Sequence, residues 1–349
     1  RFKSEYDYER GLEEREFSLE NIYILNEVED LRLQHQHTWN WTSSHQFQAG
    51  AEVMYLATNY IVEDTILGET GSGNNIDGGA WIPSLYLQHG YSPTPKWFLQ
   101  LGGRLTYHTE IDEWYPAPRL DVLYRPSEHL TFKGYAGQFY QYISQLIEWS
   151  NFLLSSPAWL VSEGEDGIPP LASSQVGAGF TWDRKGWLVD VEAYVKDLTN
   201  LTSYSSTLAS TPDLEFALGD AFIQGVDVLV KRRWNAHQRS WVSYTLSSIF
   251  YEFPELQQEI DFFRASHDQR HNLQINHSID WKPWELAIGW IYRSPKPFTP
   301  SIGNEVEEIQ EENERFWIAF PMLGTINSEN LLPYHRLDIS AMYHFKWGD

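Results

Sequence analysis

The sequence predicts an all-β fold, an antiparallel up-and-down transmembrane β-barrel of which about 14 strands are present. Three observations predict it. Apolar and polar residues alternate in twos over long segments, the connections between these segments are alternately short and long, and Trp and Tyr gather near the segment ends. Together these features are typical of barrels that cross a membrane.

The composition excludes several other classes of protein. The 349 residues include 25 Lys and Arg against 48 Asp and Glu, which gives a net formal charge of -23. Such a chain lacks the basic surface with which proteins bind nucleic acid, so no nucleic-acid partner is expected. The absence of Cys excludes disulfides, Cys-ligated zinc and thiol nucleophiles. No stretch reaches the ~18 apolar residues of a transmembrane helix, so a membrane can be crossed only by strands.

The alternation is clearest after residue 186. Trp187, Val189 and Val191 are apolar, whereas Asp190 and Glu192 between them are charged. This period of two is typical of a strand with two unlike faces. Many of these segments reach about 10 residues, longer than the usual strand of about 5 or 6. The same alternation recurs in residues 31–41, 97–108, 272–282 and 336–347.

The lengths of the connections favour a barrel over a soluble sandwich, since alternation alone fits both. Every second connection is short, which places the tight turns on one rim and the long loops on the other. Residues 26–30 are an exception, because a long loop is expected there and none is found. The expected short connections are residues 42–45, 93–96, 125–128, 183–186, 234–238 and 282–283. The expected long connections are residues 63–79, 110–117, 142–173, 197–219, 252–267 and 294–333.

Aromatic residues near the segment ends support the same fold. Indole and phenol rings prefer the boundary between hydrocarbon and lipid headgroups. The alternative, that they fill a large soluble core, places Trp at strand centres rather than ends. The residues concerned are Trp39, Trp41, Tyr55, Tyr91, Trp97, Tyr107, Trp182, Trp187, Trp241, Trp281, Trp284, Tyr292 and Trp347.

Six stretches, in order over most of the chain, resemble the barrel of a TonB-dependent outer-membrane receptor of the Bacteroidetes kind. They are PRLDVLYRPS at 118–127 with its continuation to residue 141, GVDVLVKR at 225–232, WVSYTLS at 241–247, HDQRHNL at 267–273, YRS with PFTP at 292–300, and PYHRLD at 333–338. One departure is Pro295 and Lys296 after Ser294, where the family pattern has Gly.

The resemblance implies a longer protein. Such receptors have a barrel of about 22 strands, an N-terminal plug that fills the lumen and a short TonB box. Neither plug nor box is visible here, so residues 1–349 are expected to form part of one transmembrane barrel domain, with further strands upstream and downstream.

The resemblance also implies a function. It is energised uptake of a sizeable nutrient, such as a siderophore, glycan or peptide, across the bacterial outer membrane. The implied partners are TonB through the missing plug, outer-membrane lipid and lipopolysaccharide, and a surface lipoprotein lid. Two alternatives stay open: a passive 14-strand outer-membrane channel, and a soluble or surface β-protein that binds carbohydrate. The chain carries no Ser-His-Asp order, catalytic carboxylate pair or cofactor fingerprint, so neither an enzyme nor a cofactor is expected.

Ligand contacts are expected in two long connections, 142–173 and 294–333, because aromatic rings there can stack on sugar or chelate rings. The alternative is that these rings only pack the loops together. The candidate ligand-binding residues are Trp149, Phe152, Trp159, Phe316 and Trp317, with Phe320 beside them.

The spacing of two histidine pairs suggests a metal site, but neither pair is expected to bind a metal ion. His267 and His271 are about 13 Å apart on a strand, so pairing of Asp268 with Arg270 is the better interpretation. His35 and His37 share one face at roughly 7 Å, but that face is the apolar one.

The densest acidic run is predicted to be a solvated loop that could also hold divalent cations near lipopolysaccharide. It comprises Glu305, Glu307, Glu308, Glu311, Glu312 and Glu314.

The polar sides of the strands are expected to face a watery lumen if the apolar sides face lipid. The residues assigned to the lumen are Arg104, Lys133, Asp190, Glu192, Lys196, Gln274, Asn276 and Asp280.

Overall fold

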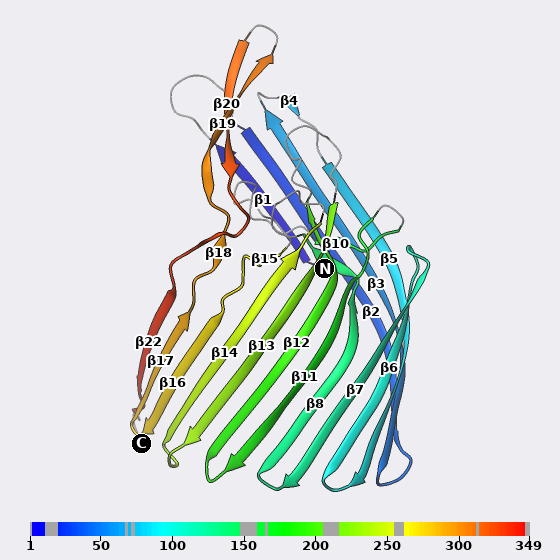
Figure 1. The fold of residues 1–349 in the computed structure, drawn as a ribbon, viewed down its shortest axis with the longest axis vertical. Helices are drawn as coiled ribbons and strands as arrows, with labels where there is room; N and C mark the ends of the chain where they lie inside the picture. Colours follow the sequence, from blue (N-terminus) through cyan, green and yellow to red (C-terminus); the bar gives the residue numbers. More distant parts are fainter. Residues whose placement is uncertain are drawn as a thin grey trace.

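The computed structural model describes residues 2–10, 20–66, 69–70, 74–146, 159–164, 167–204, 216–254, 262–311 and 314–345. Fourteen strands of this described part form one antiparallel sheet in chain order, which we call the wall (Figure 1). The predicted all-β fold and its number of strands are therefore confirmed. None of the described residues lies in a helix that is long and apolar enough to cross a membrane.

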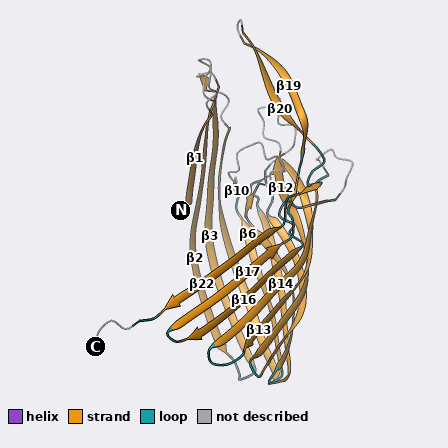
Figure 2. Ribbon diagram, turned by 90° about the vertical axis from the view of Figure 1, so that its left-hand side faces the viewer, coloured by secondary structure: helices purple, strands orange, loops and turns teal. Residues whose placement is uncertain are grey.

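The wall strands run obliquely and side by side, and the sheet curves around an interior (Figures 1 and 2). They are β1 (Phe2–Arg10), β2 (Glu20–Asn40), β3 (His45–Ile66), β5 (Asn74–Thr94), β6 (Trp97–His108), β7 (Glu113–Ser127), β8 (Leu130–Gln141), β11 (Leu171–Arg184), β12 (Trp187–Tyr204), β13 (Phe216–Arg233), β14 (Gln238–Glu252), β16 (His271–Trp281), β17 (Trp284–Arg293) and β22 (Tyr334–Tyr343).

Shorter strands belong to the connections. β4 (Glu69–Thr70) pairs with β3, and β15 (Phe263–Arg264) pairs with β14. Three small sheets of two strands each complete the described part. They are β9 (Ile143–Gln145) with β10 (Trp159–Val161), β18 (Pro297–Phe298) with β21 (Glu329–Asn330), and β19 (Ser301–Glu311) with β20 (Glu314–Leu323).

All six predicted short connections are confirmed, and they lie together at the lower end of the wall in Figure 1, which we call the turn rim. In the turn after β11, Lys185 and Gly186 have φ of 50° and 79°. Two consecutive positive φ values make a type I′ turn, whose twist matches that of the flanking strands. The pairs that close the six turns are Asn40 with Gln46, Thr94 with Trp97, Ser127 with Leu130, Arg184 with Trp187, Arg233 with Arg239, and Trp281 with Trp284.

The opposite end of the wall, the loop rim, differs from the prediction in several places. The connection 197–219 is shorter than predicted, because β12 extends to Tyr204 and β13 begins at Phe216. Residues 26–30 continue β2 without a break, so the expected exception in the pattern disappears. The connection 63–79 is shorter than predicted, because β3 extends to Ile66 and β5 begins at Asn74. The connection predicted at 110–117 is a tight turn, since β7 begins at Glu113. Beyond the bilayer both faces of a strand can be polar, so strand and loop look alike in sequence there.

Most of the predicted aromatic positions form two rows on one face of the wall, and directly paired strands bring the rings together. Trp241 lies on the other face, beside Lys231, and Trp347 lies outside the described residues. At the turn rim, the ring centroids of Trp97 and Tyr124 are 4.3 Å apart. Toward the loop rim, those of Tyr107 and Trp114 are 5.0 Å apart. On β6 and on β7 about ten residues separate the two rows, or ~33 Å at ~3.3 Å per residue. At a tilt of ~40° this corresponds to an apolar band ~25 Å tall, as in outer-membrane barrels.

The other face of the wall contains cross-strand pairs of Tyr with Gly. Tyr135 pairs with Gly177, and Tyr194 pairs with Gly225. A Cβ on these glycines would lie 2.5 and 2.6 Å from the tyrosine rings, so only glycine allows the rings to lie against the neighbouring strand. Such pairs restore contacts that a glycine alone would lose and help to fix the strand register.

The buried core lies toward the loop rim rather than at mid-wall. One cluster joins Leu56 and Ile82 of the wall to Tyr142 and Val161 of the connection after β8. A second joins Tyr60 to Leu146, Leu160 and Ile168, and a third joins Ala221 and Tyr251 to Phe263 and Ile326. Long connections therefore fold onto the wall and bury its apolar residues there.

Candidate functional site

The inner face of the wall can be identified from the connection that packs against it. β10 lies inside the curve of the sheet in Figure 2. Val161 of β10 packs with Leu56 and Ile82, which in the strand register share a face with Glu52. That face therefore lines the lumen, and the face with the two aromatic rows is the outer one.

A charged cluster on β8 and β12 is the clearest polar feature of the lumen. The Lys133 ammonium donates to Asp190 Oδ1 at 2.9 Å and lies 2.7 Å from Glu192 Oε2. Thr181 donates to the other oxygen of Asp190, and the Tyr135 hydroxyl donates to Glu192 at 3.1 Å. About a quarter of each charged side chain is exposed, so the cluster is partly hydrated while its side chains are held by ion pairs and hydrogen bonds. These contacts confirm the predicted lumen face of both strands.

A second ion pair on the inner face spans three strands. The Arg104 guanidinium on β6 donates to Glu52 Oε1 on β3 at 2.7 Å and to Ser84 Oγ on β5 at 3.2 Å. It also lies over the Tyr86 ring at 5.2 Å. Because Glu52 is almost fully buried, the pair is screened less than a surface ion pair.

The described parts of the connection between β8 and β11, residues 142–146, 159–164 and 167–170, form an inner layer in the lumen. The backbone N–H of Val161 donates to the Thr58 hydroxyl at 3.1 Å, and that of Ser162 donates to the Tyr142 carbonyl at 3.0 Å. Leu160 beside them is fully buried. This layer packs against the inner face of the wall toward the loop rim.

Glu163 follows this layer and has a perturbed carboxyl group. Burial raises its pKa, and the nearby carboxylates of Asp77 and Glu110 raise it further. A Cβ at Gly78 would lie 1.9 Å from Glu163 Oε1, so the glycine makes room for the carboxyl group. A negative charge on Glu163 therefore weakens the attachment of the inner layer.

Asp268 lies between two cations at the loop rim. Arg264 Nε donates to Asp268 Oδ2 at 2.7 Å, and Arg270 Nη2 lies 3.6 Å from the same oxygen. The predicted pairing of Asp268 with Arg270 is confirmed, and Arg264 is an additional partner.

The histidines on either side of this cluster have separate partners. The His267 ring contacts Tyr251, and burial lowers the pKa of His267. His271 Nδ1 lies 2.8 Å from the Tyr244 hydroxyl. Across the residues that the structure describes, no group of three or more His, Asp or Glu side chains is arranged to hold a metal ion.

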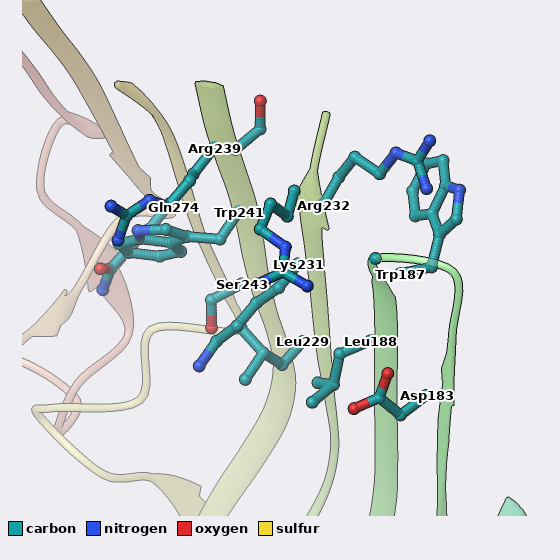
Figure 3. Close-up of a pocket in the computed structure, with 13 residues that line it drawn as sticks. Asp183, Trp187, Leu188, Leu229, Lys231, Arg232, Arg239, Trp241, Ser243 and Gln274 are labelled. Atoms are coloured by element: carbon teal, nitrogen blue, oxygen red, sulfur yellow. The ribbon is translucent and has the colours of Figure 1, made fainter. Parts of the chain in front are cut away.

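A cavity of about 700 Å³ opens on the inner face next to the turn rim, and we call it the turn-rim pocket (Figure 3). Figure 3 shows Trp187 and Arg232 turned to one side of the sheet and Lys231, Leu229 and Leu188 to the other. Its lining combines cations and the Trp241 indole with a single acid, Asp183. The cations on the lumen side of the register are Lys231, Arg233 and Arg239.

The turn-rim pocket can hold an anionic group beside an indole ring. Sequence reasoning missed it. The available signal was the group of basic residues on both sides of the short connection 234–238, in a chain that is otherwise acidic.

The predicted ligand-binding residues are not gathered in one place. Trp149 and Phe152 lie outside the described residues. Trp159 is half-buried in β10, within the inner layer. Phe316 belongs to β20, but its side chain is outside the described part, whereas Trp317 next to it is 66% exposed. Trp159 and Trp317 therefore lie in separate small sheets.

Most of the acidic run lies in strands rather than in the predicted loop, and Glu312 lies outside the described residues. Residues 301–311 form β19, which pairs with β20 in a hairpin that projects beyond the wall (Figure 1). Pairing with the apolar segment after residue 314 holds the acidic residues in a strand, which net charge alone does not reveal.

Comparison with known families agrees with this architecture. The family model described as "TonB dependent receptor-like, beta-barrel" matches residues 3–348. The chain belongs to this family. Its members are β-barrels of the bacterial outer membrane, which places the apolar outer face of the wall in lipid.

Solved structures of TonB-dependent receptors share the fold at low sequence identity. The ferric yersiniabactin uptake receptor FyuA of Yersinia pestis is 12% identical over 93% of this chain and 47% of its own, with a TM-score of 0.63. A mutant of the ferric enterobactin receptor PfeA of Pseudomonas aeruginosa is 13% identical over 95% and 53%, with a TM-score of 0.60. The RagAB peptide transporter is 11% identical over 79% and 42%, with a TM-score of 0.51.

The chain spans about half the length of the solved receptors that it matches. A search of curated proteins found no match.

Proposed function

We propose that this TonB-dependent receptor barrel takes up a sizeable nutrient by energised transport across the outer membrane. The observation that carries the proposal is a polar lumen, lined by ion pairs and partly covered by an inner layer, inside a barrel of this family. The similar structures are titled as receptors for ferric siderophores and as a peptide transporter, so these chemical classes are the first to test.

Residues 1–349 then form part of a larger barrel of about 22 strands. The partners that complete the mechanism are a plug in the lumen and TonB, which pulls on the plug from the periplasm. Lipopolysaccharide surrounds the barrel, and a surface lipoprotein lid would close it from outside. A passive channel is the competing function, and it needs neither plug nor TonB.

Capture of the ligand is assigned to aromatic residues of the connections at the loop rim. Trp317 presents an exposed indole on the β19–β20 hairpin, and Trp159 presents a half-buried one on the inner layer. Flat indole rings stack on sugar, peptide or chelate rings. Trp149, Phe152 and Phe316 belong to the same proposal.

The test uses cells that express the intact receptor. They are supplied with radiolabelled ferric siderophores, oligosaccharides and peptides, with and without functional TonB. We expect uptake of one of these classes only when TonB is present. Uptake that is equally fast without TonB would identify a passive channel and reject the proposal.

A substitution at Trp317 tests the proposed contact between the ligand and this indole ring. Trp317→Ala should weaken apparent affinity by about tenfold or less, the scale of one aromatic stacking contact. Trp281→Ala is the matched control, because that indole is 76% exposed at the turn rim, away from the connections. Equal uptake by the Trp317 variant and the control would show that Trp317 does not contact the ligand.

A further inference from the structure

The outer face of the wall contains a groove of about 620 Å³ over β11 to β14, which we call the outer groove. Its floor is made by two small residues that pair directly, Ala178 and Ala193. Larger apolar side chains stand around this floor, each between about a third and a little more than half exposed. These are Val176, Val195, Val226 and Leu246.

Strand register places this groove on the lipid side. Val195 and Val191 belong to the outer face because Glu192 between them belongs to the lumen cluster. Gln224 pairs with Val195 and with Ser248, so both polar residues point outward as well. The groove is therefore apolar along most of its length and polar at one end.

That polar end faces the loop rim and is closed by Arg270. The Arg270 guanidinium lies 6.0 Å from the centre of the Phe250 ring, and Phe250 pairs with Phe222 on the outer face. The cation is thus held on the lipid side although the backbone of residue 270 lies at the end of the sheet.

Arg270 has hydrogen-bonding capacity to spare. Arg264 Nε already donates to Asp268 at 2.7 Å, whereas Arg270 is 3.6 Å from that carboxylate. Arg264 is therefore the main partner of Asp268, and Arg270 is the more distant one. The Arg270 side chain is 42% exposed, so its guanidinium can be reached from outside the protein.

The acidic residues nearby define where an anion would sit. Asp197 pairs with Phe222 on the outer face, two strands away from the Phe250 ring that Arg270 contacts. Asp220 and Glu252 pair directly with each other one outer row further toward the loop rim. Like charges there repel an anion, so a negative headgroup is favoured at Arg270, next to the apolar band.

We propose that the outer groove binds one anionic, acylated lipid of the outer leaflet, and we assign it to the phosphorylated lipid A part of lipopolysaccharide. An acyl chain lies along the valines and Leu246, where it buries apolar surface on both partners. A phosphate oxygen accepts hydrogen bonds from Arg270, as charge-assisted pairs of Arg with phosphate commonly do. Gln224 and Ser248 donate to the same headgroup.

The experiment uses the intact receptor purified in detergent and native mass spectrometry to count bound lipids. The probes are hexa-acyl lipid A with two phosphates, phosphatidylglycerol and zwitterionic phosphatidylcholine. We expect one retained lipid A per receptor and weaker retention of the other two probes. Arg270→Gln should weaken lipid A binding about tenfold or more, whereas Arg270→Lys should keep part of it.

Two further variants separate headgroup from acyl contacts. Ala193→Phe fills the floor of the groove and should abolish retention of lipid A. Arg184→Gln removes an exposed cation at the turn rim and should leave retention unchanged. Heat-dependent migration on gels verifies that each variant is folded.

Equal retention by the wild type and Arg270→Gln would overturn the proposal. Retention of phosphatidylcholine as strong as that of lipid A would overturn it too, since the headgroup would then contribute nothing. Phosphatidylglycerol bound as tightly as lipid A would overturn the assignment to lipopolysaccharide.

Discussion

The outer and inner faces of the wall belong to the same strands and are stabilised in opposite ways. On the outer face, Leu101 and Val176 are 63% and 55% exposed although paired strands flank them on both sides. On the inner face, Lys133 and Arg104 join carboxylates across neighbouring strands. The apolar face is stabilised by hydrocarbon outside the protein, and the polar face by contacts that the protein supplies itself.

This difference shows that an exposed side chain of this molecule can face either lipid or water. An exposed Leu on a water-soluble protein costs free energy, whereas here it lies in the membrane solvent. The outer face of the wall needs no protein layer against it, because lipid covers it. In the part of the chain that the structure describes, the clusters of buried apolar residues lie toward the loop rim, where water lies on both sides.

The largest expected effect comes from a charge on the outer face. Val191 lies near the middle of the apolar band, between Trp187 at the turn rim and Asp197 toward the loop rim. Val191→Arg should cost roughly 2 to 4 kcal/mol of folding free energy in lipid vesicles, measured by denaturant titration.

The neighbouring residue Glu192 provides the matched control. Glu192→Gln keeps the shape on the lumen side and loses only one of the two partners of Lys133, a change of about 1 kcal/mol or less. Equal destabilisation by both variants would contradict the assigned faces.

An intermediate effect is expected from a methyl group on the inner face. A Cβ at Gly179 would lie 2.2 Å from the Val191 carbonyl oxygen and 3.0 Å from Lys133 Cε. Because the backbone must move, Gly179→Ala should cost about 1 to 3 kcal/mol.

The control for this change is an outer-face glycine. At Gly134 the nearest atom to an added Cβ is 3.7 Å away, which is an ordinary contact. Gly134→Ala should therefore change the unfolding free energy little in the same titration. A larger loss at Gly134 than at Gly179 would mean that the space around the two glycines is misjudged.

The smallest effect concerns the inner layer and depends on pH. Burial and the carboxylates of Asp77 and Glu110 raise the pKa of Glu163, so the attached layer favours its protonated form. The stabilisation is complete below the ordinary pKa of the carboxyl group and is lost as pH rises through the raised value.

Hydrogen exchange at the Val161 amide, corrected with a wall amide, measures this attachment. The wild type should lose protection as pH rises, and Glu163→Gln should keep it. Glu110→Gln should have a smaller effect, because the Glu110 carboxylate raises the pKa of Glu163 less than burial or Asp77 does. The same pH dependence in the wild type and Glu163→Gln would show that Glu163 does not control the layer.

Most of the wall was predictable from local pattern. The alternation at 187–196 assigned Val191 and Glu192 to opposite faces, and all six short connections were located. The connections at the loop rim were predicted less well. Residues 26–30 and the acidic run in 301–311 lie in strands, and neither their charge nor their periodicity indicates it.

The sites were harder to predict than the wall. Asp268 and Arg270 are close in sequence, and their pairing was inferred correctly. Arg104 and Glu52 come from different strands, and so do the cations around the turn-rim pocket. The register between these strands cannot be inferred from the sequence of any single strand. For the same reason the candidates Trp159 and Trp317 were grouped together although they belong to separate sheets.

By itself, the sequence determined the strand period, the faces and the rim that carries the turns, because each depends on residues a few positions apart. Only the tertiary structure decided which connection folds into the lumen, which cations meet which carboxylates, and where an outer groove ends at Arg270. Those features depend on register between strands and on long connections returning to the wall, and such contacts join residues that are distant in the chain.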